Sequence, residues 1–280
     1  MRDSIAHVHE SAAHHRNGVV TLVLKMSAPT STILWCRSGS EFSRVAADHV
    51  AALLAVKPEA VIALPTGQTP LGLYAELVAR AAAKRLSVAQ ARFFNLDDYL
   101  GLSVDHPLSY ARFLREHFLM PAGVAEEHIR LLRGDAVGIE AECRDYEAAI
   151  AAAGGLDLAI LGLGTNGHIG FNEPGSDWSA QTHLVSLSEE TRATHVAQTQ
   201  GMFVIPQYGI TVGVATILAA REILLLVVGG GKARALAAFR RGIADPKWPV
   251  TALLTHRNLT VLADAGLQSA AVADVMVPHC

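Results

Sequence analysis

The densest group of residues able to do chemistry is at 164–174, which read Gly-Thr-Asn-Gly-His-Ile-Gly-Phe-Asn-Glu-Pro. His168 and Glu173, two side chains that transfer protons, lie five residues apart there. The apolar run at residues 156–163 just before them predicts a buried strand. Because open α/β sheets bind ligands outside the carboxyl ends of their strands, we expect His168 to act on a substrate. Glu173 and Asn166 can then orient the imidazole ring and set its tautomer. A purely structural histidine is the alternative.

A second candidate is a pair of carboxylates. Residues 93–99 read Phe-Phe-Asn-Leu-Asp-Asp-Tyr, so Asp97 and Asp98 follow a predicted strand. A partly buried carboxylate has a raised pKa and can act as a general base. The alternatives are a helix cap and a solvated loop. A metal site is not expected, since no cluster of matching ligands accompanies the pair.

A third loop, at residues 64–70, reads Leu-Pro-Thr-Gly-Gln-Thr-Pro between a predicted strand and a predicted helix. Here we expect Thr69 to cap the helix and Pro70 to be its first residue. Free backbone N–H groups at a helix N-terminus bind phosphate, although the Gly-Lys-Ser/Thr of a Walker A loop is absent. An ordinary capped turn is the alternative. The candidate phosphate-binding residues are Thr66, Gly67, Gln68 and Thr69.

A fourth loop carries a positive charge. Residues 227–232 read Val-Val-Gly-Gly-Gly-Lys, again between a predicted strand and a predicted helix. Lys232 can bind a phosphate as a point charge. The alternative is a solvated lysine on an exposed turn. Four such loops at predicted strand ends together favour a site more strongly than any one of them.

Apolar runs alternate with helical patterns along the chain, which indicates βαβ units and a mostly parallel sheet in an α/β fold. No repeat or long linker interrupts the pattern, so we expect a single domain. Strands are expected at residues 32–35, 60–64, 92–96, 156–163, 223–228 and 259–263. Helices are expected at residues 41–54, 70–83, 106–118, 140–152, 206–219 and 232–241.

Composition excludes several classes of protein. The formal net charge is −3, which argues against a nucleic-acid platform, and no apolar run reaches the ~18 residues of a membrane helix. The three cysteines lack CxxC spacing, which suits a reducing cytoplasm. Residues 1–30 are weakly periodic and rich in histidine, so we expect a poorly ordered extension there rather than a metal site, with the domain at 31–280.

Taken together, the motifs resemble the glucosamine-6-phosphate deaminase (isomerase) family. The resemblance covers roughly residues 60–235, and the string Gly-His-Ile-Gly-Phe-Asn-Glu-Pro is its most specific part. The related 6-phosphogluconolactonases share the fold but usually lack that string and Asn-Leu-Asp-Asp-Tyr. The matching segments are 64–70, 94–101 with 106–110, 162–174, Thr191-Arg192, 211–213 and Gly231-Lys232.

This resemblance implies a Rossmann-like parallel-sheet sandwich with helices on both faces. It also implies conversion of an amino-sugar phosphate to a ketose phosphate and ammonia, with no cofactor. Asp97 would be the base that moves a proton between C2 and C1, and His168 would open the pyranose ring. Glu173 and Asn166 would orient His168. The phosphate cradle would be Thr66, Gly67, Gln68, Thr69 and Lys232.

Two departures from the family pattern qualify what it implies. Members usually place a phosphate-binding arginine about five residues after Arg192, and residues 193–200 of this chain contain no arginine. His195 or another cation would have to replace it. His183 and Val185 stand where the allosterically activated hexameric branch has basic residues, and at Val185 that charge is lost. The alternatives to a deaminase are a lactonase and a non-catalytic sugar-phosphate sensor. A homo-oligomer is compatible with the sequence.

Overall fold

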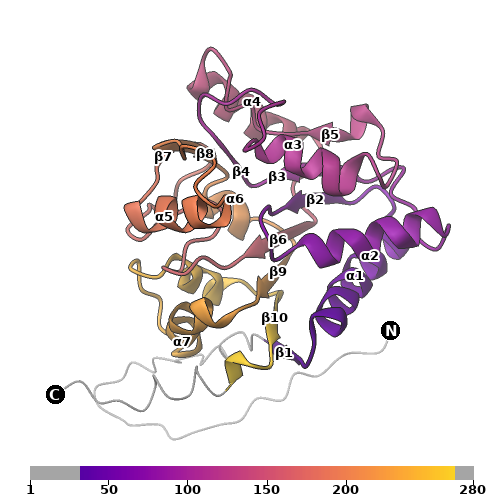
Figure 1. Ribbon diagram of the computed structural model, residues 1–280. Coiled ribbons are helices and arrows are strands. Elements are labelled where there is room, and N and C mark those ends of the chain that lie inside the picture. Colours follow the sequence, from indigo (N-terminus) through magenta and orange to yellow (C-terminus); the bar gives the residue numbers. More distant parts are fainter. Residues whose placement is uncertain (1–31, 269–280) are drawn as a thin grey trace, which may run out of the picture.

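The computed structural model describes residues 32–268 of the 280-residue chain. The expected extension at residues 1–30 and the last residues of the expected domain lie outside this range. The main sheet has seven parallel strands (Figure 1). Their order across the sheet is β1 (Thr32–Cys36), β10 (Leu259–Asp264), β9 (Glu222–Val227), β6 (Leu158–Gly162), β2 (Val61–Leu64), β3 (Arg92–Asn95) and β5 (Ile129–Arg130).

Helices cover both faces of this sheet, as expected. Because strand residues alternate between faces, Ile62 and Leu64 pack into one apolar cluster while Val61 and Ala63 pack into another. The first face is covered by α1 (Gly39–Val56), α2 (Leu71–Ala82), α3 (Tyr110–Leu114) and the π-helical turn η1 (Arg115–Leu119). The second is covered by α4 (Ile139–Ala152), α6 (Val214–Leu218), α7 (Ala233–Arg240) and the 3-10 helix η4 (Pro249–Thr255).

Two predicted helix starts are wrong. The helix expected from residue 106 begins at Tyr110, because the Ser109 hydroxyl caps it by accepting a hydrogen bond from the Arg112 N–H. Thr69 does not cap α2: the residue at the N-cap position is Pro70, and no side chain caps the helix. The loop before α2 therefore keeps its backbone N–H groups available.

A second sheet was not expected from the sequence. It has three antiparallel strands in the order β4 (Asp97–Tyr99), β8 (Tyr208–Thr211) and β7 (His183–Ser186). The helix predicted at residues 206–219 is therefore wrong in its first half, and only α6 remains. Tyr208–Thr211 is extended because it pairs with strands on both sides, which overrides the local apolar spacing.

One further helix, α5 (Glu189–Gln198), follows β7 and was also not expected. It begins where the Ser188 hydroxyl accepts a hydrogen bond from the Thr191 N–H, and Glu189 and Glu190 occupy its first turn. Both features stabilise a helix N-terminus. In Figure 1, α5 lies beside β7 and β8, close to the end of β6.

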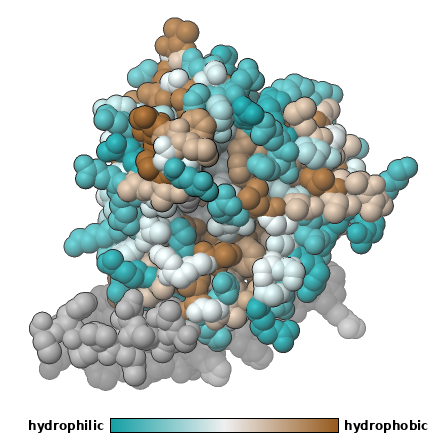
Figure 2. All heavy atoms as spheres, in the orientation of Figure 1, coloured by the Kyte–Doolittle hydropathy of each residue, from teal (hydrophilic) through white to brown (hydrophobic). Residues whose placement is uncertain are grey.

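The surface is mixed in character. On the face shown in Figure 2, hydrophilic residues (teal) surround separate hydrophobic patches (brown) rather than one continuous apolar band. None of the helices between residues 32 and 268 is both long and apolar enough to cross a lipid bilayer.

Candidate active site

The topology brings the four loops to one edge of the main sheet. They follow β9, β6, β2 and β3, which are consecutive strands in the sheet order. Because all four strands are parallel, their carboxyl ends lie at the same edge. The strand order therefore brings four predicted site elements to the same edge of the sheet: Asp97, His168, Lys232 and the 66–69 loop.

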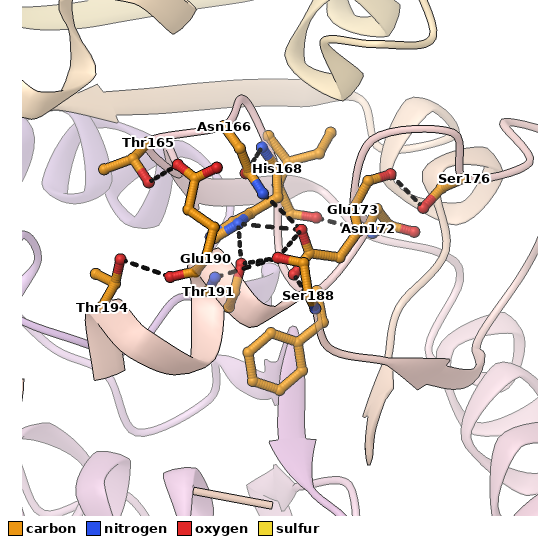
Figure 3. Close-up of polar contacts among 12 residues, drawn as sticks. Thr165, Asn166, His168, Asn172, Glu173, Ser176, Ser188, Glu190, Thr191 and Thr194 are labelled. Carbon is orange, nitrogen blue, oxygen red and sulfur yellow. Dashed lines mark hydrogen bonds and ion pairs between the residues drawn. The ribbon is translucent and has the colours of Figure 1, made fainter. Parts of the chain in front are cut away.

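His168 follows β6 and packs tightly against its own loop. A Cβ at Gly164 would lie 2.4 Å from the imidazole ring, so only glycine leaves room for it. The ring Nδ1 lies 3.3 Å from the Thr191 hydroxyl and 3.9 Å from Glu173 Oε2 (Figure 3). Burial, and then the charge of Lys232, lowers the pKa of His168 to about 4. The imidazole is therefore neutral at pH 7, and its contact with Glu173 is not an ion pair there.

Glu173 is the centre of the network that surrounds His168 (Figure 3). Its carboxylate accepts hydrogen bonds from Asn166 Nδ2 at 2.7 Å and from the backbone and hydroxyl of Ser188. Asn166 also accepts a hydrogen bond from the His168 backbone N–H at 3.1 Å. No hydrogen bond of the described chain joins Asn166 to the imidazole. Asn166 thus contacts Glu173 and the backbone of the loop, and its role in orienting the ring stays a prediction.

Asp97 is the first residue of β4, and a buried asparagine fixes the turn before it. Asn95 donates to the Asp97 carbonyl at 2.7 Å and accepts from the Leu132 N–H and the Tyr146 hydroxyl. A Cβ at Gly170 would lie 3.6 Å from Asp97 Oδ2, so this carboxyl lies beside the loop that carries His168.

The Asp97 carboxyl is chemically unusual. Only 6% of the residue is exposed, and no hydrogen bond within residues 32–268 reaches its side-chain oxygens. Burial, and then the negative charge of Asp98, raises its pKa to about 8. A buried carboxyl without partners is expensive to ionise, and once ionised it is a stronger base than a solvated one.

Asp98 has a different environment. Its carboxylate accepts hydrogen bonds from the backbone N–H groups of Tyr99, Tyr110 and Ala111 and from the Ser109 hydroxyl, at 2.8–3.1 Å. Burial raises its pKa to about 6, and these four donors oppose that rise. Because both oxygens are engaged at the start of α3, Asp98 is built to hold the helix in place.

The loop after β2 presents unpaired donors. Within the described chain, no hydrogen bond uses the backbone N–H of Thr66, Gly67, Gln68 or Thr69, and none uses the two threonine hydroxyls. Gly67 has φ +91°, a left-handed conformation that glycine adopts without strain. Successive free N–H groups before a helix form a concave surface that suits an anion.

Lys232 ends the 3-10 turn η3 (Gly230–Lys232) just before α7. No ion pair found between residues 32 and 268 includes it, and burial lowers its pKa. Its positive charge contributes to the lowered pKa of His168 and, to a smaller extent, of His195. A partly buried ammonium group that has no ion-pair partner among these residues fits a phosphate.

Sequence reasoning assigned no role to Ser188 or Thr191, although Thr191 belongs to one of the matching segments. Thr191, on α5, contacts His168, and Ser188, the N-cap of α5, contacts Glu173. The only sign of them in the sequence is the pattern Ser-Glu-Glu-Thr at residues 188–191. This pattern is typical of a helix start, but it does not predict where the helix packs. His195 lies one turn further along α5, where its Nδ1 is hydrogen-bonded to the Tyr99 hydroxyl. Among residues 32–268, no group of three or more metal-ligating side chains is found.

Comparison with known proteins agrees with this architecture. The family profile described as glucosamine-6-phosphate isomerases/6-phosphogluconolactonase matches residues 39–262. The chain belongs to this family. A glucosamine-6-phosphate deaminase of Mycolicibacterium smegmatis is 42% identical over 221 residues, which are 79% of this chain and 85% of that one.

Solved structures of the family show the same fold. A monomeric glucosamine-6-phosphate deaminase superposes with a TM-score of 0.82 at 36% identity, over 85% of this chain and 99% of that one. A 6-phosphogluconolactonase from Thermotoga maritima superposes with a TM-score of 0.68 at 19% identity, over 84% and 100%. The second likeness shows the fold alone. The expected Rossmann-like α/β sandwich and the family are both confirmed.

Proposed function

We propose that this protein is a deaminase that converts a 2-amino-2-deoxyhexose 6-phosphate, glucosamine 6-phosphate in particular, to fructose 6-phosphate and ammonia. The observation that carries this proposal is the unpaired, buried Asp97 carboxyl beside the loop of a neutral His168. An isomerase needs such a base to remove a proton from carbon. The relatives named as glucosamine-6-phosphate deaminases support the same activity.

The residues divide the reaction between them. Neutral His168 relays a proton to the ring oxygen as the pyranose opens to the aldehyde, while Glu173 and Thr191 hold the imidazole. Ionised Asp97 then removes the proton from C2, which gives an enolamine, and returns it to C1, which gives an imine at C2. Water adds to that imine, and ammonia leaves C2. The free N–H groups of the 66–69 loop and the Lys232 ammonium hold the 6-phosphate.

A lactonase on the same fold is the nearest alternative. It requires attack of water on an ester carbonyl and has no need of a base positioned for a carbon-bound proton. A sensor without turnover is the other alternative. The free, buried thiols of Cys36 and Cys143 agree with an enzyme of the reducing cytoplasm, where we place it.

A coupled ammonia assay tests the proposal. Wild-type protein is incubated with glucosamine 6-phosphate, with its galacto epimer and with unphosphorylated glucosamine, and lactone hydrolysis is measured separately. We expect ammonia from the glucosamine phosphate and no lactone hydrolysis above the blank. In Lys232→Ala, kcat/KM for the phosphorylated substrate should fall at least tenfold, chiefly through KM, because a charge-assisted contact is lost. Equal turnover of unphosphorylated glucosamine, unchanged in Lys232→Ala, would refute the phosphate site.

A further inference from the structure

His195 lies at the edge of this site in a setting that the mechanism does not use. It follows Thr191 by one helical turn of α5, so it is on the helix face that contacts His168. Its ring packs against two aromatic rings, with centroids 5.9 Å from Tyr99 and 6.1 Å from Phe171. The His195 Nδ1 is hydrogen-bonded to the Tyr99 hydroxyl. The His195 Nε2 has no hydrogen-bond partner among the described residues.

The hydrogen-bond chain has a direction. The Tyr110 hydroxyl donates to the Tyr99 oxygen at 3.3 Å. The Tyr99 hydroxyl therefore donates its own proton to its other partner, His195 Nδ1. Because burial raises the pKa of both tyrosines, the hydroxyls remain protonated donors. Nδ1 acts as the acceptor, and the ring proton of a neutral His195 must be on Nε2.

We propose that Tyr99 and Tyr110 fix His195 as a neutral Nε2–H tautomer that donates a hydrogen bond to the 6-phosphate of the bound sugar. This inference rests on the proposed function. The phosphate ligand in this proposal is an uncharged donor, whereas the sequence led us to expect a cation in place of the arginine missing after Arg192.

The surroundings of His195 favour the neutral form. Burial lowers its pKa to about 4, and the charges of His168 and Lys232 lower it as well, whereas Glu173 opposes them. Tyr99 and Tyr110 contribute no charge while protonated. A cation at this position would also compete with the Tyr99 proton for the space at Nδ1. Lys232 then supplies the positive charge, and His195 supplies a directed hydrogen bond.

The first experiment reads the tautomer directly. Protein labelled with ¹⁵N in its histidines is studied by two-bond ¹H–¹⁵N correlation at pH 7, and His195→Phe assigns the ring signals. We expect a neutral ring with its proton on Nε2. Tyr99→Phe should turn the His195 signals into those of a tautomer mixture. Tyr208→Phe, which changes an exposed tyrosine, should leave them unchanged.

The second experiment measures calorimetric affinity for glucosamine 6-phosphate and for inorganic phosphate. His195→Phe should weaken both roughly tenfold or more, as expected for loss of a hydrogen bond to a charged oxygen. His195→Gln, whose amide can place a donor near the position of Nε2, should recover most of that loss. The control His117→Phe replaces an exposed histidine and should bind like wild type. Tyr99→Phe should weaken binding only when His195 is present, because it acts through that ring.

The outcomes separate this inference from the proposed function. A ring that carries its proton on Nδ1 or is cationic at pH 7, or a folded His195→Phe that binds both ligands as wild type does, overturns the inference while ammonia release still supports the deaminase. If wild type releases no ammonia but binds inorganic phosphate through an Nε2–H His195, the deaminase is refuted and the donor role is kept. Equal losses from Tyr99→Phe with and without His195 would show a merely structural tyrosine and would also overturn the inference.

Discussion

Asp97 and Asp98 show how two adjacent residues of one type receive different tasks from their surroundings. Asp98 accepts four hydrogen bonds, whereas the Asp97 carboxyl has none within the described chain. The sequence predicted that one of the pair is a base and kept Asp98 as a second candidate. It could not separate them, because the donors to Asp98 come from residues 109–111, which only the fold brings near.

We expect Asp97→Asn to lower kcat by roughly 10²–10⁴-fold with little change in substrate affinity, because a base acts in the transition state. Asp98→Asn is the matched control. It should mainly lower the free energy of unfolding, by roughly 1–2 kcal/mol, because it weakens the cap of α3. Steady-state kinetics, exchange of the C2 proton with deuterium and thermal melts check both variants. Continued exchange in Asp97→Asn, with its loss in a folded Asp98→Asn, would assign the base to Asp98.

The raised pKa of Asp97 predicts the pH dependence of activity. The base must be ionised, and its pKa of about 8 leaves it mostly protonated at pH 7. We therefore expect kcat/KM to fall roughly tenfold per pH unit below about pH 8. His168, with a pKa of about 4, should add no second step between pH 5 and 8. A profile that is flat from pH 6 to 8 would show that Asp97 is ionised in the free enzyme and would contradict the effect of burial.

The same shift predicts a cost in stability. The pKa of Asp97 is higher in the folded chain than its ordinary value of 3.8, so the folded state binds the proton more tightly. Stability from this group is fully present below about pH 4 and is lost as pH rises toward 8. Asp97→Asn, which cannot ionise, should melt near the wild-type temperature at pH 4 and a few degrees above it at pH 8. Thermal melts of both proteins between pH 4 and 8 test this. A difference in melting temperature that does not change with pH would contradict the prediction.

At the scale of elements, the sequence predicted the strands of the main sheet that are buried on both faces. It missed the strands of the small sheet, which are stabilised by pairing with one another. Six strands of the main sheet contain the apolar runs that predicted them, and all six are found. The seventh, β5, is only Ile-Arg and was not predicted. The small sheet has no such signal. β4 is Asp-Asp-Tyr and β7 is His-Leu-Val-Ser, which become strands only because β8 lies between them. Local patterns cannot predict strands that depend on partners outside their own segment, and β4 lies more than a hundred residues from β8 in the sequence.

The loop after β6 offers a test at this scale. A methyl group at Gly164 would meet the His168 ring at 2.4 Å, whereas one at Gly162 would meet nothing within 4 Å. We expect Gly164→Ala to displace His168 and to lower kcat by at least tenfold, since a shift of about 1 Å at a catalytic group costs roughly that much or more. Gly162→Ala should keep most of the activity. Kinetics on both variants, with circular dichroism as a check on folding, compare them. Equal activities of Gly164→Ala and Gly162→Ala would mean that the loop accommodates the added methyl group without displacing the His168 ring.

At the scale of the whole molecule, the strand order explains why the site was predictable at all. The four loops are spread over some 170 residues of the chain, yet β9, β6, β2 and β3 lie side by side. A parallel sheet gathers loops at one edge whatever their separation in sequence. The contribution of α5 was not predictable in the same way, because Ser188 and Thr191 reach the site through the packing of a helix that follows β7. His195 was a candidate only because the resemblance showed that an arginine was missing nearby.

The small sheet also bears on regulation of the whole enzyme. Val185, on β7, stands where the allosterically activated branch of the family has a basic residue, and it packs against an apolar cluster that contains Tyr99 and Phe171. An effector can shift a conformational equilibrium only through contacts that differ between two states, and a phosphorylated effector would find no charge on this side chain. We therefore expect velocity to rise hyperbolically with glucosamine 6-phosphate and to be insensitive to N-acetylglucosamine 6-phosphate. Initial rates with and without that compound, run beside an enzyme of the activated branch as positive control, test this. A sigmoidal curve that the effector makes hyperbolic would refute it and would indicate that other residues replace the missing charge.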